Sequence, residues 1–211
     1  MLHIYIFLSR IFYFIAPIFI IIRKLRGKEH TLRYKEKLGR YQNKNPYIND
    51  FIIHIHGASL GETLSSFPVM HKLHALYPEV KFIITSGTKS SGLVMEKKLP
   101  DYATHYFAPL DTPKIVDRFL NHINPNLTII IDSEIWPNFL LKAKERKLPI
   151  FALNMRFSER SRKRWMFFKS DFQKIMRAYE GFFVQNDTTA HFIRQVSNQT
   201  CLLYTSDAAD D

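Results

Sequence analysis

The chain has 211 residues, a mass of 25.0 kDa and a formal net charge of +11. This length suits one α/β domain plus an anchor, and the single cysteine, Cys201, excludes an internal disulfide and a cysteine-rich zinc site. Basic residues gather in residues 1–46, where ten oppose only Glu29 and Glu36, and in residues 156–177, where eight oppose two acids. Such surfaces attract phosphate, in nucleic acid, anionic lipid or a phosphorylated ligand.

The first predicted element is an apolar stretch at residues 2–22, long enough to cross a bilayer. Arg10 near its middle and the helix-kinking Pro17 weaken a simple span, so a helix lying in the membrane plane is an alternative. A buried first helix of a soluble domain is a third interpretation. Because Arg23–Arg40 follow directly, the positive-inside rule places the rest of the chain on the cytoplasmic side, close to anionic head groups.

From residue 51 the sequence alternates short apolar strands with helices. Strands are predicted at 51–56, 81–85, 105–107, 127–131, 150–154 and 181–184. Helices are predicted at 61–77, with a kink or late start at Pro68, and at 93–99, 115–121, about 138–146 and 156–177. This alternation predicts an α/β fold with a parallel sheet covered by helices on both faces.

Polar residues follow four of these strands, at the edge where parallel sheets bind ligands. They are Ser59, Gly61 and Glu62; Ser86, Gly87 and Thr88; Asp132, Ser133 and Glu134; and Asn154, Arg156, Ser158 and Arg160. Three carboxylates beside a basic rim suit acid–base chemistry on a phosphorylated or anionic substrate.

Two interpretations of the carboxylates stay open. Glu62 follows a Gly-bracketed loop, where it can act as a general base or can simply cap a helix. Asp132 and Glu134 precede Pro137, so they too can be an N-cap and a first-turn acid. On an extended segment these two side chains point in opposite directions, so one can face the cleft while the other holds a neighbouring loop.

Other site types have weaker support. His54 and His56 lie on the same side of a predicted strand, but no third metal ligand has suitable spacing, so we expect no metal. The sequence contains no Walker A and no G-x-G-x-x-G motif. No nucleic-acid recognition fold is visible either. With an apolar anchor upstream, lipid phosphate is the better partner, and we expect no nucleic acid.

Five motifs, in this order, resemble those of Kdo (3-deoxy-D-manno-octulosonic acid) transferases. They are HGASLGE at 56–62, TSGTKSSG at 85–92, YFAPLDTP at 106–113, IDSEIWPN at 131–138 and NMRFSERS at 154–161. The anchor followed by RKLRGKE is similar to the start of proteins in this family.

The resemblance implies an inverting glycosyltransferase of the GT-B type, built from two Rossmann-like domains, at the cytoplasmic face of the inner membrane of a Gram-negative bacterium. The implied donor is CMP-Kdo and the implied acceptor is the lipid A precursor (lipid IVA), in lipopolysaccharide biosynthesis, with no cofactor and no metal. The number of Kdo units transferred stays open.

The resemblance also implies roles for single residues. Glu62 matches the family's catalytic base, and Asp132 occupies the position of a glutamate thought to stabilise the transition state, with a side chain shorter by one methylene. Substrate contacts are expected from the remaining cleft residues: Ser59, Gly61, Ser86, Thr88, Glu134, Asn154, Arg156 and Arg160. The two arginines are the candidate phosphate ligands.

The expected organisation has four parts. An anchor (1–22) and a basic juxtamembrane segment (23–46) precede an acceptor-side Rossmann-like domain (47–196). A tail (197–211) matches neither the family nor the α/β alternation, and we expect it to be a spurious, loosely packed or disordered extension. The family's donor domain, which binds most of CMP-Kdo, is not within this sequence, so the chain alone is expected to be inactive.

Two alternative functions remain. Another GT-B lipid-linked sugar transferase would share the fold without the five motifs. A non-catalytic membrane-surface binding module would explain the anchor and the charge, but not Glu62 on its Gly-bracketed loop.

Overall fold

A parallel sheet forms the centre of the computed structural model, which describes residues 1–197 and 200–203. The strands are β1 (Ile52–His56), β2 (Lys81–Ser86), β3 (Ala103–Phe107), β4 (Leu127–Ile131), β5 (Ile150–Met155), β6 (Gly181–Val184) and β7 (Thr200–Leu203). Their order is β3-β2-β1-β4-β5-β6-β7, and every neighbouring pair is parallel. All carboxyl ends therefore share one edge, and the strand order reverses between β1 and β4, the position where such sheets bind ligands.

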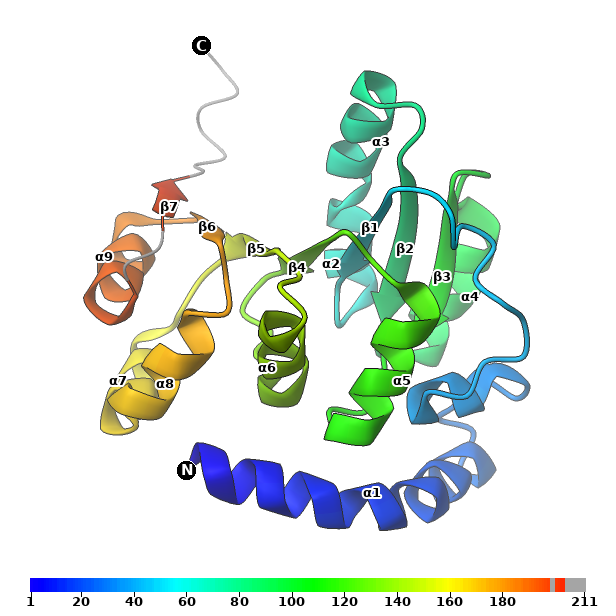
Figure 1. The fold of residues 1–211 in the computed structure, drawn as a ribbon, viewed down its shortest axis with the longest axis horizontal. Helices are drawn as coiled ribbons and strands as arrows, with labels where there is room; N and C mark the ends of the chain where they lie inside the picture. Colours follow the sequence, from blue (N-terminus) through cyan, green and yellow to red (C-terminus); the bar gives the residue numbers. More distant parts are fainter. Residues whose placement is uncertain (198–199, 204–211) are drawn as a thin grey trace.

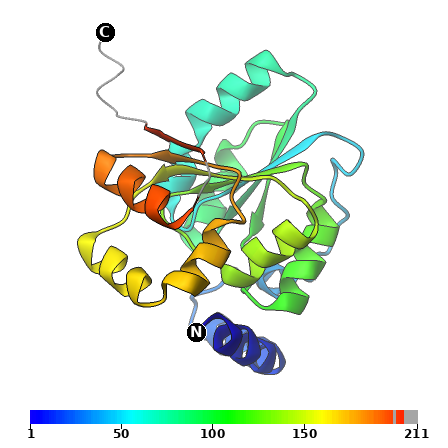
Figure 2. The same ribbon diagram turned by 60° about the vertical axis from the view of Figure 1, so that its left-hand side comes forward.

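Helices cover both faces of this sheet (Figures 1 and 2). After the 3₁₀ helix η1 (Arg33–Leu38) they are α2 (Leu60–Ser65), α3 (Phe67–Leu76), α4 (Lys89–Lys98), α5 (Pro113–Ile123), α6 (Pro137–Glu145), α7 (Glu159–Phe167), α8 (Lys169–Met176) and α9 (Asp187–Val196). Neighbouring residues Ile83 and Ile84 of β2 belong to different core clusters, because successive strand residues point to opposite faces. The predicted Rossmann-like α/β fold is confirmed.

The helix boundaries differ from the predictions in three places. The predicted helix at 61–77 is divided into α2 and α3 after Ser65. Pro68 stands in the first turn of α3, where its missing N–H costs nothing, so the late start predicted at Pro68 is confirmed. The Arg-rich helix at 156–177 is divided at Phe168 into α7 and α8. Helix α4 begins at Lys89, four residues before the predicted start, because the Thr88 hydroxyl accepts a hydrogen bond from the Ser91 N–H.

The tail also differs from the expectation where it is described. Residues Thr200–Leu203 form β7, which pairs with β6 in register from Gly181 opposite Thr200 to Val184 opposite Leu203. The α/β alternation therefore continues beyond residue 196. Residues 198–199 and 204–211, on which the rest of that prediction falls, lie outside the described residues.

The apolar N-terminal stretch forms helix α1 (Leu2–Leu25), which is long and apolar enough to cross a membrane. It lies along the molecule next to η1, α5 and α6, on the side where α5 and α6 begin (Figure 1). Since helices that follow parallel strands begin at the carboxyl edge of the sheet, α1 borders the edge that carries the predicted site.

Candidate functional site

The four loops predicted to form the site are neighbours in the structure. They follow β2, β1, β4 and β5, which are consecutive in the sheet. The TSGTKSSG, HGASLGE, IDSEIWPN and NMRFSERS segments therefore meet along one continuous edge, although they are spread over residues 56–161 of the sequence. 

Glu62 lies in the first turn of α2 and closes a capping box with Ser59. Its Oε2 accepts hydrogen bonds from the N–H groups of Ala58 (2.8 Å) and Ser59 (3.4 Å), and its Oε1 accepts one from the Ser59 hydroxyl (2.8 Å). The capping interpretation is thus confirmed. It does not exclude a role as a base, because an ionised carboxylate offers about four acceptor positions and the side chain is only half-buried.

The two glycines of this loop have different surroundings. A Cβ atom on Gly57 would lie 2.8 Å from the Thr63 backbone nitrogen, so the loop can fold against α2 only with glycine there. A Cβ atom on Gly61 would meet nothing within 4 Å. Gly61, one residue before Glu62 in the sequence, therefore borders open space where a substrate can approach the backbone.

Asp132 follows β4 in a left-handed backbone conformation, with φ 62°, which Asp and Asn tolerate better than most residues. Its Oδ1 accepts a hydrogen bond from the Ser133 N–H (2.6 Å), and its Oδ2 lies 3.7 Å from Nε of Arg156. The Ser133 hydroxyl also binds the backbone of Arg156. These contacts with Arg156 connect the loop after β4 to the loop after β5.

Asn154, also left-handed with φ 64°, accepts a hydrogen bond from Gln185 at 2.7 Å.

Glu134 has different partners from those of Asp132. Its Oε2 accepts a hydrogen bond from Nε1 of Trp136 at 2.8 Å, and its carbonyl accepts one from the Tyr179 hydroxyl at 3.3 Å. The Glu134 side chain thus contacts its own loop, whereas the acid whose side chain reaches the neighbouring loop, at Arg156, is Asp132.

The remaining predicted residues divide into buried and open ones. Ser86 is fully buried and binds Ser91 (2.6 Å) and His105 (2.8 Å), so its hydroxyl supports the loop after β2 and does not face a substrate. Thr88 is exposed at the start of α4, in a groove that Arg23, Lys28 and Lys89 also line. Arg156, with its side chain 63% exposed, and the exposed Arg160 form an open basic rim.

A buried hydrogen-bonded chain of histidine and threonine lies under this edge. His54 Nε2 and His56 Nδ1 both bind the Thr85 hydroxyl, at 2.8 and 2.9 Å. Burial lowers the pKa of His56 to about 4 and, together with the nearby His56, the pKa of His54 well below its usual value. Both rings are therefore neutral at pH 7. His56 Nε2 is buried without a hydrogen-bond partner among the described residues, and its ring packs edge-on against Trp136.

Sequence reasoning did not single out Lys37, Asp111 or Tyr5, which line a cavity of about 280 Å³ with Gly87 and Trp136 at the carboxyl ends of β2, β3 and β4. Lys37 donates a hydrogen bond to the Gly87 carbonyl at 2.8 Å. Asp111 accepts hydrogen bonds from the Tyr5 hydroxyl (2.8 Å) and from the Phe139 N–H (2.9 Å). Burial raises the pKa of Asp111, while these hydrogen bonds act in the opposite direction. The only sequence signal was the position of Asp111 in the YFAPLDTP motif.

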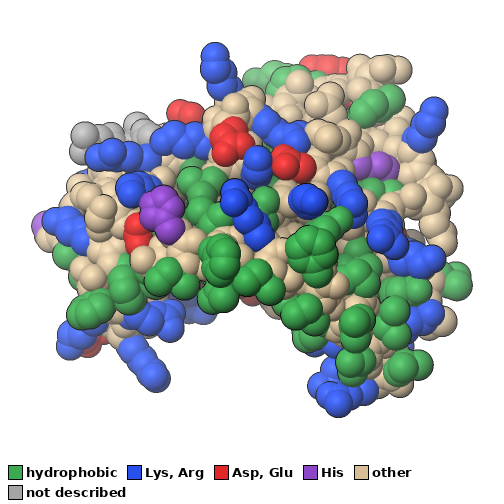
Figure 3. Space-filling model, turned by 60° about the horizontal axis from the view of Figure 1, so that its bottom comes forward, with side chains coloured by type: hydrophobic (Ala, Val, Ile, Leu, Met, Phe, Trp, Pro, Cys, Tyr) green, Lys and Arg blue, Asp and Glu red, His purple; other side chains and the backbone are tan. Residues whose placement is uncertain are grey.

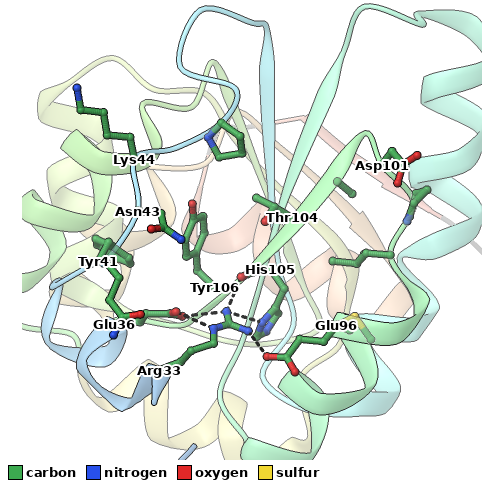
Figure 4. Close-up of a pocket in the computed structure, with 16 residues that line it drawn as sticks. Arg33, Glu36, Tyr41, Asn43, Lys44, Glu96, Asp101, Thr104, His105 and Tyr106 are labelled. Carbon is green, nitrogen blue, oxygen red and sulfur yellow. Dashed lines mark hydrogen bonds and ion pairs between the residues drawn. The ribbon is translucent and has the colours of Figure 1, made fainter. Parts of the chain in front are cut away.

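A larger cavity, of about 530 Å³, lies elsewhere, beside the edge strand β3 (Figure 4). Arg33 spans its base: Nε binds Glu36 at 2.7 Å, Nη1 binds Glu96 at 2.7 Å, and Nη2 binds the His105 carbonyl at 2.5 Å. These ion pairs join η1, α4 and β3, so this network holds the basic segment against the domain.

No group of three or more His, Cys, Asp or Glu suited to a metal occurs among the described residues. His54 and His56, the pair considered for a metal, direct one ring nitrogen each to the same threonine hydroxyl.

Comparison with known proteins gives the chain its relatives. Residues 32–206 match the family model described as 3-deoxy-D-manno-octulosonic-acid transferase (kdotransferase). The chain is 34% identical over 204 residues to the 3-deoxy-D-manno-octulosonic acid transferase of Rickettsia bellii, covering 96% of this chain and 48% of that protein. It is 30% identical over 157 residues to the transferase of that name from Haemophilus influenzae, covering 74% of this chain and 36% of that protein.

The chain spans about half the length of the Rickettsia relative. Among solved structures, a UDP-N-acetylglucosamine 2-epimerase superposes with a TM-score of 0.50 at 12% identity, over 74% of this chain and 48% of that one. At this identity the superposition supports the fold alone.

Proposed function

This chain belongs to the Kdo transferase family, and on that premise we propose that it forms the acceptor-side half of an inverting glycosyltransferase. The proposed reaction transfers Kdo from CMP-Kdo to the lipid A precursor (lipid IVA) in lipopolysaccharide biosynthesis, at the cytoplasmic face of the inner membrane. The observation that supports it most strongly is the Glu62 carboxylate, fixed at the carboxyl edge of the sheet beside the Asp132 loop.

In the proposed step, Glu62 removes the proton from an acceptor hydroxyl while that oxygen attacks the anomeric carbon of Kdo. A new C–O bond forms on the face opposite the departing phosphate, the bond between Kdo and phosphate breaks, and CMP leaves with the bonding electrons. A carboxylate within hydrogen-bond reach assists such an attack because the free hydroxyl has a high pKa.

The contacts of Glu62 support this role in two ways. Three hydrogen bonds from Ala58 and Ser59 fix the orientation of the carboxylate, and a base held in place needs no reorganisation when the proton is transferred. The open space next to Gly61 leaves room for an acceptor hydroxyl.

The other cleft residues receive roles from their exposure and charge. Asp132 is proposed to stabilise the developing positive charge on the sugar ring, and Arg156 and Arg160 to bind phosphate of the acceptor. Ser59, Gly61, Thr88, Glu134 and Asn154 are proposed to shape the substrate site. For Ser86 we propose support of the loop only, since it is buried.

The donor side is proposed to require sequence beyond this chain, because the Rickettsia relative is about twice as long. CMP-Kdo enters the proposal as a substrate, and the proposed chemistry uses no resident cofactor or metal. Transfer by the full-length enzyme should therefore continue in the presence of EDTA.

The decisive experiment separates capping from catalysis at Glu62. Glu62→Gln keeps the shape and the capping box, since glutamine serves at this position as well as glutamate, but it removes the basic carboxylate. In a full-length enzyme carrying this segment, we expect transfer to fall by a factor of about 10² or more, as is typical for a lost general base, with unchanged thermal stability. Transfer within a few-fold of the parent would show that Glu62 is only a helix cap.

A matched control is Ser59→Ala, which removes the partner in the capping box and leaves the carboxylate. It should lower stability by about 1 kcal/mol. Because Ser59 is itself proposed to shape the substrate site, Ser59→Ala should change mainly the KM for the acceptor, whereas Glu62→Gln should lower kcat. If both variants lose activity in proportion to their stability, the base assignment is wrong.

A further inference from the structure

Helix α1 is attached to the domain along its whole length. The buried residues Leu2, Ser9, Ala16 and Ile20 recur at intervals of seven or four, so they form one stripe of the helix. This stripe faces η1, α5 and α6 (Figure 1).

Polar contacts hold this docked stripe at intervals from end to end. The N-terminal ammonium lies 2.8 Å from Asp171, the Ser9 hydroxyl accepts a hydrogen bond from Asn138 (3.0 Å), and the Tyr13 hydroxyl accepts one from Arg118 (2.9 Å). Further along, Arg23 contacts Glu29 at 2.5 Å, and Glu29 in turn lies 2.6 Å from Lys37 of η1. At 1.5 Å per residue these contacts extend over about 33 Å, the full thickness of a hydrocarbon core.

A helix docked in this way cannot stand across a bilayer. A transmembrane orientation would carry the domain surface around Asp171, Asn138 and Arg118 into hydrocarbon, where unsatisfied polar groups cost several kcal/mol each. The contacts are compatible only with a helix whose axis is parallel to the membrane surface.

The opposite face of α1 is apolar and open. Its exposed side chains are Ile4, Phe7, Leu8, Ile11, Phe14, Ile15, Ile18, Ile21, Ile22 and Leu25, with Phe14 73% and Leu25 82% exposed. In Figure 3, which brings this side of the molecule forward, hydrophobic side chains form a band bordered by Lys and Arg. An apolar face with cationic borders is the composition of helices that lie in the interface of an anionic membrane.

The position of Arg10 fits this orientation. At 3.6 residues per turn, Arg10 falls about 90° from the centre of the exposed apolar face, and its side chain is exposed. In a transmembrane helix it would lie at mid-bilayer, whereas in a helix lying flat it can reach the head groups.

The docked helix also borders the candidate site. Tyr5 lines the cavity of about 280 Å³ together with Lys37, Gly87 and Trp136, and its hydroxyl binds Asp111 at 2.8 Å. Asp111 in turn accepts hydrogen bonds from the first N–H groups of α6, at Asn138 (3.1 Å) and Phe139 (2.9 Å). The membrane-facing helix and the cleft are therefore joined through one carboxylate.

We propose that α1 lies in the plane of an anionic bilayer, remains docked to the domain there, and contributes Tyr5 as a wall of the cavity through which a lipid substrate reaches the cleft. The last part rests on the proposed function, because only a lipid acceptor would use such an entrance. The first two parts stand without it.

Depth measurements test the orientation. In a Cys201→Ser background, Ile4→Cys, Phe14→Cys and Ile22→Cys each carry one fluorescent label, and quenching by lipids with nitroxides at known depths is measured in phosphatidylglycerol-containing vesicles. All three labels should lie about 5–10 Å below the head groups. A label at Phe14 near mid-bilayer, about 15 Å deep and well below the other two, would overturn the proposal. The control Lys72→Cys, on α3 at the opposite side of the molecule, should not be quenched.

A crosslink tests whether the helix stays docked. Ser9→Cys and Asn138→Cys, again without Cys201, place two thiols where the native side chains are 3.0 Å apart. Joined by oxidation or by a short bifunctional reagent, the pair should leave vesicle affinity within about twofold of the reduced protein, since the membrane-binding face is untouched. Loss of vesicle binding on crosslinking would show that α1 must undock from the domain to bind the membrane. In the labelling experiment above, quenching by added lipid-free protein that carries a quencher, in place of quenching by lipid, would show that a second copy of the chain covers this face.

Thiol protection tests the role of Tyr5. Tyr5→Cys and its neighbour Ile4→Cys are modified by a small neutral reagent in vesicles, with or without an acylated, bis-phosphorylated disaccharide glycolipid at constant surface charge. The glycolipid should slow modification at position 5 about fivefold or more and leave position 4 unchanged, because only position 5 borders the cavity. Equal effects at both positions would remove Tyr5 from the lipid entrance. Because neither readout requires transfer, this failure is distinct from a failure of Glu62 as the base.

Discussion

The Lys37 ammonium lies 2.6 Å from the Glu29 carboxylate, with both side chains almost fully buried. The same ammonium donates a hydrogen bond to the Gly87 carbonyl, in the loop after β2. Arg23, near the end of α1, binds the other oxygen of Glu29. One buried acid therefore connects α1 to a loop of the candidate site.

Removal of Lys37 should strongly destabilise the protein. Lys37→Met leaves Glu29 buried with only Arg23 as a partner, and breaking a buried pair on one side costs about 3–5 kcal/mol. The double variant Lys37→Met with Glu29→Gln should recover part of that loss, because no unpaired charge remains. Urea unfolding in mild detergent measures both. Additive losses in the double variant would contradict a direct interaction between these two residues.

The glycines of the HGASLGE segment should respond differently to the same substitution. Gly57→Ala brings a methyl group to 2.8 Å from the Thr63 nitrogen, so the loop must shift, at a cost of about 1–3 kcal/mol. Gly61→Ala meets nothing within 4 Å and should be neutral or slightly stabilising, because alanine restricts the unfolded chain and favours a helix.

Thermal unfolding of the two alanine variants distinguishes these cases, and transfer assays in a full-length enzyme add a second comparison. If Gly61 borders the acceptor, Gly61→Ala should raise the KM for the acceptor without loss of stability. An unchanged KM would show that the open space at Gly61 is not used by substrate.

The strands were predictable because each is a short apolar run between polar residues. The strands predicted at 127–131 and 181–184 have the same bounds as β4 and β6 in the structure. Helix α9 was missed, although Asn186 followed by apolar residues at helical spacing is a recognisable start signal. The 3₁₀ helix η1 had no such pattern, since its six residues include three basic ones and its position depends on ion pairs with distant elements.

The edge that carries the site was predictable from topology, but its internal contacts were not. Strand ends place Glu62 and Asp132 on neighbouring loops by a general rule of parallel sheets. The contact of Lys37 with Gly87 joins residues 50 positions apart, and that of Tyr5 with Asp111 joins residues 106 positions apart. Such pairings depend on how η1 and α1 pack, and no local sequence pattern encodes them.

Stability should fall in mild acid because several histidines are buried in the neutral state. Burial lowers the pKa of His56 to about 4, and burial together with the Arg33 charge lowers the pKa of His105 to about 3. Below the unfolded pKa of about 6.5, the unfolded chain binds protons that the folded protein does not. Stability therefore decreases as the pH falls from about 6.5 to about 4, by up to about 1.4 kcal/mol per pH unit for each such histidine.

Urea unfolding at pH 7.5, 5.5 and 4.5 measures this slope. His56→Asn should reduce the slope between pH 6.5 and 4, while His191→Gln, at an exposed position of α9, is the matched control. The prediction is wrong if the two variants have equal slopes.

Asp132 offers a way to remove a charge without disturbing the backbone. Its φ of 62° is unfavourable for most residues, but Asn tolerates this conformation as Asp does, and Asn154 already adopts it at the end of β5 with φ 64°. Asp132→Asn should therefore leave the melting temperature nearly unchanged.

If the Asp132 carboxylate stabilises the transition state, Asp132→Asn in a full-length enzyme should lower kcat by a factor of about 10²–10³, with little change in the KM for the acceptor. Asp132→Glu, which keeps the charge on a side chain longer by one methylene, should retain most of the activity if the carboxylate stays in reach. Loss in Asp132→Asn that appears mainly as a higher KM would instead place Asp132 in substrate binding, through its contact with Arg156. The comparison thus separates charge from geometry at Asp132.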